Sequence, residues 1–305
     1  MNQIRYQGVK ALTFTSIMSA ISLVFVLVTY FFSGIGIFLV LVLPLIAALV
    51  ALKVDFKFAL IYIIATTAMS FIDFQLQLFV ILPSLISGII FGYLIRTSVQ
   101  GYYIIFLISV LNIGMQIGAT YLINIIYQID LINVYSTFLK ISYATFNKVY
   151  YLFLFVLALI QTVITYIIMT NEIKKIGFEF NENKNHYLWI YIGEIILISL
   201  SIGMNFLNPS FTYVLIGFSL YFGVVLGVYH FTYYKRKFML ITQNILYAVS
   251  VILIFVFSTI VPNNYKPLLL LVLVGSEILC GLFIIIYSKL IKKEKMDSHV
   301  FDKID

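Results

Sequence analysis

The sequence predicts an all-α integral membrane protein, folded as a polytopic bundle of transmembrane helices. Of its residues, 63% are hydrophobic and 10% are charged, whereas about a quarter are charged in soluble globular proteins. The mean hydropathy is +1.09. The apolar runs are long and unbroken, which favours membrane-spanning helices over the short alternating segments of an outer-membrane barrel.

Apolar runs of about 17 to 25 residues are long enough to cross a bilayer as one helix, and they predict about ten spans. These spans are residues 9–32, 35–52, 58–72, 78–95, 102–127, 149–170, 187–206, 211–231, 238–260 and 267–289. The first run follows two basic residues, Arg5 and Lys10. We expect an uncleaved helix there and not a signal peptide, because the run is long and further spans follow it.

The polar stretch Asn171–His186 predicts the main boundary of the chain, because it separates six spans from four. The expected domains are a six-helix membrane unit at 1–170, a cytoplasmic loop at 171–186, a four-helix membrane unit at 187–290 and a charged cytoplasmic tail at 291–305.

The basic residues predict the orientation in the membrane. If both termini are cytoplasmic, only Lys140, Lys148 and Lys266 lie outside, which leaves 16 of the 19 basic residues inside, as the positive-inside rule requires. This distribution also accounts for the net charge of +7, so we expect no nucleic-acid partner. Cys280 is the single cysteine, so no disulfide can form within the chain.

The fifth predicted span carries an unusual polar stripe. Its members follow one another at i+4 spacing and are Asn112, Gln116, Thr120 and Asn124. A helix that faces only lipid would not carry such a stripe. Gly114 and Gly118 lie on the opposite side and predict a close contact with another helix. The stripe either hydrogen-bonds to neighbouring helices as packing contacts or lines a polar cavity for a solute.

A second polar face is predicted on the sixth span, where Gln161 and Thr165 share one side with Ala158 and Thr162. Between the fifth and sixth spans, residues 128–148 have the pattern of an amphipathic helix on the outer surface. Its expected apolar face consists of Ile132, Tyr135, Leu139, Ser142, Tyr143 and Phe146. This helix would either cap the bundle or act as a lid over the polar stripe.

Two spans carry small residues at four-residue spacing, a pattern that allows close helix contact. In the first span these candidate docking residues are Thr15, Ser16, Ser19 and Ala20, and in the fourth they are Ser84, Gly88 and Gly92. Such ladders serve either tight packing within the bundle or docking of a partner's helix.

Two carboxylates, Glu194 and Glu277, fall inside predicted spans, and an ionised carboxylate within a bilayer needs a partner. For Glu277, near the centre of the tenth span, the candidate partners are Gln243, Asn244 and His230. The two acids are either structural, protonated or bonded to amides, or they couple transport to protons or cations.

Several kinds of chemistry are missing from the sequence. It has no GxxxxGK[ST] loop for nucleotide phosphates. Its histidines, His186, His230 and His299, are scattered, and no HExxH motif or cysteine cluster is present to hold zinc. We therefore expect no enzymatic activity, no cofactor and no metal site.

The first six spans resemble the S component of energy-coupling-factor transporters, the membrane subunit that captures a vitamin or metal. The resembling segments are ALTFTSIMSA in the first span and LPSLISGIIFGYLI in the fourth. The resemblance implies that the first helix docks onto a coupling membrane subunit with ATPases, through Thr15, Ser16, Ser19 and Ala20. It also implies a solute bound in the outer half, among the later helices.

The whole chain is similar to the YybS-type family of predicted bacterial membrane proteins, which carries an S-component-like fold. The segments that carry this similarity are LIGFSLYFGVVLGVYHFTYYKRK at Leu215–Lys237 and LVLVGSEILCGLFIIIYSKL at 271–290. The family's last helix has an acid followed by an arginine, and here Glu277 is followed by Lys289 instead. The resemblance implies a multi-pass protein of the bacterial cytoplasmic membrane.

Three functions remain open from the sequence. The first is a non-enzymatic protein that binds or helps import a small solute and is energised by a separate ATPase and coupling protein. The second is a non-transporting membrane scaffold or regulatory partner that recognises another protein through its small-residue ladders. The third is an ion-coupled carrier that uses Glu194 and Glu277. In each case the lipid bilayer surrounds the protein.

Overall fold

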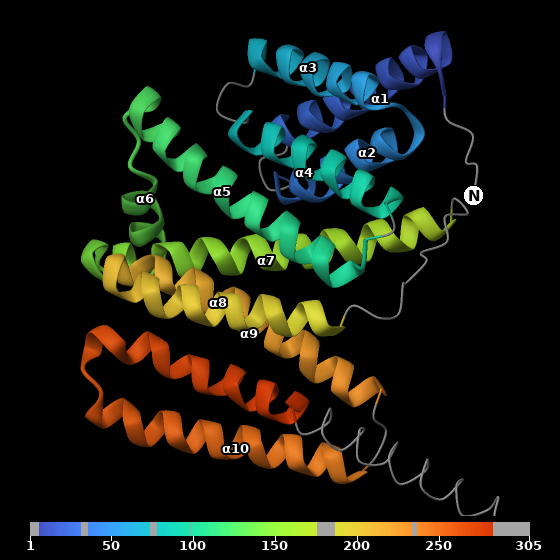
Figure 1. The fold of residues 1–305 in the computed structure, drawn as a ribbon. Coiled ribbons are helices and arrows are strands. Elements are labelled where there is room, and N and C mark those ends of the chain that lie inside the picture. The colour runs from blue at the N-terminus through green and yellow to red at the C-terminus, as the bar shows by residue number, and fades with distance from the viewer. Residues whose placement is uncertain are drawn as a thin grey trace, which may run out of the picture. The chain divides into compact units, whose positions relative to one another are not determined.

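The computed structural model describes residues 6–31, 36–73, 78–97, 99–175, 187–233 and 237–282. Within these ranges the chain is almost entirely helical and contains no strand, which confirms the predicted all-α class (Figure 1). The chain divides into two compact units, Met1–Lys184 and Asn185–Asp305. They are called unit 1 and unit 2 below.

Unit 1 is built from seven helices among its described residues. They are α1 (Gly8–Phe31), α2 (Gly36–Lys53), α3 (Phe56–Asp73), α4 (Leu78–Arg96), α5 (Gly101–Tyr127), α6 (Leu131–Phe138) and α7 (Tyr143–Lys175). Six of them are long and apolar, and α6 is a short helix between the end of α5 and the start of α7 (Figure 1). Helices predominate because lipid offers no hydrogen bonds to an open backbone.

Unit 2 contains three long helices followed by a helical segment that begins in 3₁₀ form. They are α8 (Tyr187–Leu207), α9 (Pro209–Tyr233), α10 (Lys237–Ile260) and the 3₁₀ helix η2 (Asn263–Leu270). An α-helix over 271–282 continues directly from η2. Helix α8 packs along α9, and η2 contacts α8, α9 and α10.

Eight helices in the described part of the chain are long and apolar enough to cross a membrane. Two shorter apolar helices, Val42–Lys53 and Phe56–Phe71, occupy the second and third predicted spans. The predicted spans thus coincide with helices. The end of the tenth span and the tail at 291–305 lie outside the described residues.

The sixth span is longer than predicted. The predicted helix covers 149–170, whereas α7 runs from Tyr143 to Lys175. Its extra amino-terminal turn begins after Ser142, whose side-chain oxygen accepts a hydrogen bond from the Thr145 backbone N–H at 3.3 Å. At the other end, α7 includes the first part of the predicted cytoplasmic loop, and residues 176–186 of that loop lie outside the described residues.

The predicted amphipathic helix over 128–148 is wrong as a single element. Only Leu131–Phe138 forms the separate helix α6. Asp130 caps its start by accepting hydrogen bonds from the N–H groups of Ile132 and Asn133. Lys140, with φ of 56°, then takes a left-handed conformation, which ends the helix. Tyr143 and Phe146 therefore belong to the start of α7, and Ser142 immediately precedes it.

The tightest helix contact in unit 1 joins α4 to α2. A Cβ atom added to Gly88 would lie 2.4 Å from the Pro44 carbonyl oxygen, and one added to Gly92 would lie 2.6 Å from the Ala48 carbonyl oxygen. Only glycine allows the two backbones to approach this closely. The ladder of Ser84, Gly88 and Gly92 thus packs inside the bundle.

Candidate functional site

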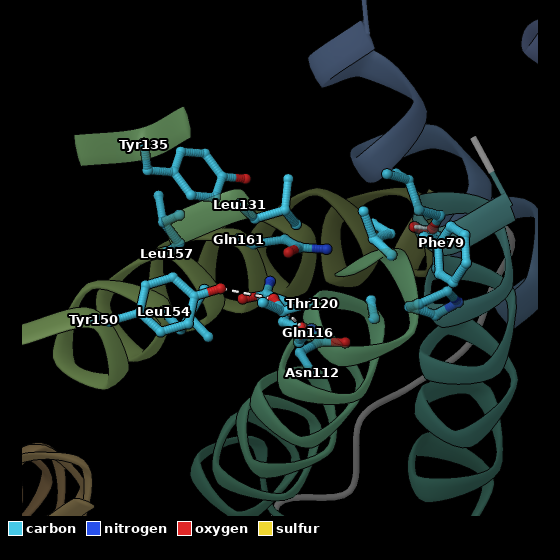
Figure 2. A pocket seen from close by; sticks show the side chains of 15 residues that line it. Phe79, Asn112, Gln116, Thr120, Leu131, Tyr135, Tyr150, Leu154, Leu157 and Gln161 are labelled. Carbon is cyan, nitrogen blue, oxygen red and sulfur yellow. Dashed lines mark hydrogen bonds between the residues drawn. The ribbon is translucent and has the colours of Figure 1, made fainter. Parts of the chain in front are cut away.

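A cavity of about 210 Å³ lies among α4, α5, α6 and α7 of unit 1 (Figure 2). Its walls combine amides, hydroxyls and aromatic rings with aliphatic side chains. The lining residues are Phe79, Val80, Pro83, Ser84, Asn112, Gln116, Ala119, Thr120, Ile123, Leu131, Tyr135, Tyr150, Leu154, Leu157 and Gln161. None of these fifteen residues is charged.

The polar wall on α5 consists of three members of the predicted stripe, Asn112, Gln116 and Thr120. Asn112 is the most deeply placed, with 4% of its surface exposed. Its amide Nδ2 donates a hydrogen bond to the Thr162 hydroxyl of α7 at 3.2 Å. Thr162 in turn donates to the Ala158 carbonyl oxygen at 2.7 Å. This contact joins α5 to α7 at one end of the cavity.

A second contact between α5 and α7 involves Thr120 and Tyr150. Their hydroxyl oxygens lie 2.6 Å apart (Figure 2). Thr120 also donates to the Gln116 carbonyl oxygen at 2.9 Å. Because a hydroxyl has one proton, Tyr150 must donate to Thr120. The Tyr150 hydroxyl oxygen, on the cavity wall, can still accept a hydrogen bond.

Two glutamine side chains lie in the cavity between these contacts. Gln116 comes from α5 and Gln161 from α7 (Figure 2). The Gln116 carbonyl oxygen Oε1 is buried and has no hydrogen-bond partner among the described residues. An unsatisfied buried acceptor is costly, by about 1–3 kcal/mol. Gln116 is therefore ready to accept a hydrogen bond from a molecule in the cavity.

A second, water-sized cavity of about 10 Å³ lies next to the first. Asn112 and Gln161 line both cavities. The Thr165 hydroxyl lies on the smaller one and has no hydrogen-bond partner among the described residues. Thr165 was predicted to line the solute cavity, and the structure places it in this adjoining space instead.

Asn124 does not belong to the cavity. It is exposed and absent from the cavity lining, so its assignment as a cavity residue is wrong. Each i+4 step advances about 40° around a helix, and three steps from Asn112 amount to roughly 120°. The stripe therefore turns away from the cavity before it reaches Asn124.

The expected close contact at Gly114 and Gly118 is also wrong within the described residues. Both glycines are exposed, and a Cβ atom added to either would meet nothing within 4 Å. The opposite face of α5 is therefore open.

The site contains residues that the sequence did not single out. Tyr135 and Leu131 reach it from α6, and Tyr150 reaches it from the start of α7. The Tyr135 ring of α6 packs against two rings of α7, with its centroid 5.5 Å from that of Phe153 and 6.5 Å from that of Phe146, and these contacts connect α6 to α7. The sequence had placed Tyr135 only on an apolar helix face. No pattern in the sequence marked Tyr150 as a cavity residue, because it lies in the first turn of a uniformly apolar predicted span.

The candidate docking residues of α1 fall on two different faces. Thr15 and Ser19 are buried, whereas Ser16 and Ala20 are exposed. Adjacent residues on a helix point about 100° apart, so the two i+4 pairs cannot share one surface. Since α1 packs against α2 and α3, Thr15 and Ser19 are not available to a partner in this structure.

The two acids lie in unit 2 and have different surroundings. The Gln243 amide Nε2 of α10 donates to both carboxylate oxygens of Glu277, at 3.1 and 3.3 Å. Tyr247 is also hydrogen-bonded to this carboxyl group. Glu194 of α8 accepts one hydrogen bond, from the Ser219 hydroxyl of α9 to Oε1. Of the sequence candidates for Glu277, the structure places Gln243 there, and the His230 side chain lies outside the described residues.

Within the described ranges, no group of three or more His, Cys, Asp or Glu side chains is arranged to hold a metal ion. The cavity offers neutral donors and acceptors and apolar walls.

Residues 20–153 match a family model described as "Predicted membrane protein (DUF2232)". The match extends from α1 into the first part of α7 and includes the cavity-lining segments of α4, α5 and α6. No curated protein and no solved structure matches the chain. Together with the eight long apolar helices, the match identifies an integral membrane protein.

Proposed function

We propose that unit 1 binds a small, uncharged, polar solute in the cavity among α4, α5, α6 and α7, without catalysing a reaction. The observation that supports this most is the buried, unpartnered Gln116 Oε1 on the wall of a cavity of about 210 Å³. Intramembrane polar groups are costly and commonly mark substrate pathways.

The lining chemistry defines the class of solute. Because no charged side chain lines the cavity, an ionic solute would lose its hydration without a counter-charge. Gln116 Oε1 calls for a hydrogen-bond donor on the solute, and the Tyr150 and Tyr135 rings offer flat apolar surface. Ligand pockets for drug-sized molecules measure about 300–1,000 Å³, so the solute is smaller than these.

The resemblance to S components extends this proposal to transport. A separate coupling membrane subunit with ATPases would then energise import across a bacterial cytoplasmic membrane, with both termini of this chain on the inner side. The exposed residues Ser16 and Ala20 of α1 would take part in docking, in place of the full set predicted from the sequence.

The proposal is tested by native mass spectrometry of protein extracted gently from its membrane. We expect a retained small molecule on the wild-type chain and an affinity lower by roughly 5- to 150-fold, seen as reduced occupancy, for Gln116→Leu, because the buried acceptor contributes roughly 1–3 kcal/mol. Asn112→Leu should act in the same direction. Asn124→Leu is the matched control, since it removes an amide from the same helix outside the cavity.

Equal occupancy in Gln116→Leu, Asn112→Leu and Asn124→Leu would remove the stripe from the binding site. A retained molecule that depends on none of the cavity residues would count against the cavity as a whole. Thermal unfolding of each variant in the same detergent separates loss of binding from loss of fold.

A second candidate function is a non-transporting scaffold that recognises a helix of another membrane protein. The observation that favours it is the exposed face of α1, where Ser16 and Ala20 lie four residues apart. The Ser16 hydroxyl already donates to the Leu12 carbonyl oxygen at 3.0 Å, so this face can enter an apolar contact without an unpaired polar group.

A further inference from the structure

Unit 2 buries two carboxyl groups that differ in how their oxygens are satisfied. The exposed fraction of Glu194 is 0% and that of Glu277 is 1%. We propose that Glu194 is held as a neutral carboxylic acid and is a proton-exchange site of unit 2. The inference concerns unit 2 only and does not depend on the solute cavity of unit 1.

The argument begins with the second oxygen of Glu194. Oε1 accepts a hydrogen bond from Ser219, but Oε2 is buried and has no hydrogen-bond partner in the described part of the chain. An ionised carboxylate spreads its charge over both oxygens and needs donors for each. A protonated carboxyl group instead places its hydrogen on one oxygen and leaves the other as a carbonyl acceptor. A proton on Oε2 removes the charge, and a buried neutral O–H without an acceptor costs far less than a buried unpaired charge.

Within the described part of unit 2, no charged side chain is hydrogen-bonded to Glu194. The titratable groups on the elements packed against α8, among the described residues, are Tyr213, Tyr221, Tyr265, Lys266, Glu277 and Cys280. Among the described residues, the group that donates a hydrogen bond to Glu194 is the neutral hydroxyl of Ser219. An unpaired charge in an apolar interior costs so much that the group takes up a proton instead.

Glu277 serves as the internal comparison. Gln243 donates to both of its oxygens, and Tyr247 lies against the same carboxyl group. Gly227 of α9 makes room for this arrangement, because an added Cβ atom would lie 3.0 Å from Gln243 Nε2 and 3.4 Å from Glu277 Oε1. Each Glu277 oxygen thus has a hydrogen-bond donor, whereas Glu194 Oε2 has none among the described residues.

The exchange step involves no reactant other than water and its hydronium ion. A lone pair on Oε2 forms a bond to a proton delivered by a hydronium ion, whose O–H bond breaks to leave a water molecule, and the carboxylate charge is neutralised. Release reverses the step, and the bond to the proton breaks while its electron pair stays on Oε2. No electron is transferred and no group leaves.

Infrared difference spectroscopy of the full chain, reconstituted in liposomes, tests the assignment. A protonated carboxyl group has a C=O stretching band that an ionised carboxylate lacks. At neutral pH we expect this band in the wild-type protein and in Glu277→Gln, with complete loss in Glu194→Gln. Transfer from H₂O to D₂O should shift the band, because the proton exchanges.

Ser219→Ala provides a second variant that keeps Glu194 in place. Loss of the Ser219 hydrogen bond to Oε1 should move the C=O band to a higher wavenumber and leave its area unchanged. Thermal unfolding of all three variants in the same liposomes or detergent checks that they are folded.

Three results would overturn the assignment. They are a C=O band that persists in Glu194→Gln, a band that disappears in Glu277→Gln, and no band in the folded wild-type protein at neutral pH. A fourth result would also overturn the assignment. If the C=O band is lost when Na⁺ replaces choline as the buffer cation at constant pH, Glu194 binds a metal cation in place of the proton. Solute occupancy in unit 1 is measured separately, so failure of one proposal leaves the other standing.

Discussion

The Tyr150 hydroxyl lies 2.6 Å from the Thr120 hydroxyl and ties the start of α7 to the carboxyl-terminal half of α5. The Asn112 amide ties the same two helices together at 3.2 Å from Thr162. The cavity lies along the stretch of α5 between these two contacts, and Gln116 is within that stretch. The polar stripe therefore has two roles, since Asn112 and Thr120 connect α5 to α7 and Gln116, between them, faces the cavity.

We expect Tyr150→Phe to weaken this connection while leaving the cavity in place. The ring remains, but the donor to Thr120 is lost, and hydrogen bonds between membrane helices contribute about 0.6–2 kcal/mol. Unfolding in mixed detergent micelles should show a loss of this size. Tyr143→Phe is the control, because Tyr143 is 46% exposed at the start of the same helix. Equal stability of the two variants would show that the contact contributes nothing.

We expect Gly88→Ala to be strongly destabilising and Gly114→Ala to be neutral or slightly stabilising. The added methyl group at Gly88 would collide with the backbone of Pro44 at 2.4–2.6 Å, whereas Gly114 has open space around it. Overpacking costs about 1–3 kcal/mol, and alanine is favoured over glycine within a helix by about 1 kcal/mol. Thermal unfolding of both variants measures the difference. A stable Gly88→Ala protein would contradict the tight contact between α2 and α4.

A cysteine at position 161 should report whether water reaches the cavity. In a Cys280→Ser background, we expect Gln161→Cys to react with a small water-soluble methanethiosulfonate reagent. Ile164→Cys is the control, because Ile164 lies on the exposed apolar side of α7 and should react at least about tenfold more slowly in lipid, where the thiolate is not formed. If both positions remain unlabelled in folded protein, the cavity is closed to water.

Substitutions in α1 should separate packing from docking. Thr15 is 1% exposed, so Thr15→Leu should lower the unfolding temperature through overpacking. Ser16→Leu should leave stability unchanged, because Ser16 is exposed, but it should abolish co-purification of a partner that docks on this face. Unimpaired partner recovery with Ser16→Leu would exclude this face of α1 as the docking surface.

Much of the fold could be predicted because spans are defined by uniform apolar composition. The predicted fifth span at 102–127 and the observed α5 at Gly101–Tyr127 differ by a single residue. The prediction was wrong at 128–148, where periodicity suggested one amphipathic helix. Local features decided that segment, namely the Asp130 cap, the left-handed Lys140 and the Ser142 contact at the start of α7. Each of these features depends on a single residue. None of them changes the spacing of apolar residues, so the helical periodicity of the sequence could not reveal them.

The candidate site was only partly predictable. Asn112, Gln116, Thr120 and Gln161 lie on the cavity as the solute hypothesis requires, but their role in binding stays a prediction. Tyr150 could not be found, because an aromatic residue in an apolar span has no spacing that distinguishes it. The small-residue ladder of α4 was compatible with either packing or docking, and only the position of Pro44 and Ala48 shows that α2 fills it.

The sequence by itself determined that this chain is a helical membrane protein, because only helices and closed barrels satisfy the backbone in lipid and long unbroken apolar runs fit helices alone. It also determined which helices carry polar groups. Only the tertiary structure decided where those groups point, since helix rotation depends on packing against neighbours. That rotation brings Gln116 to a cavity, leaves Asn124 outside it, and gives Glu277 two donated hydrogen bonds from Gln243 while Glu194 receives one from Ser219.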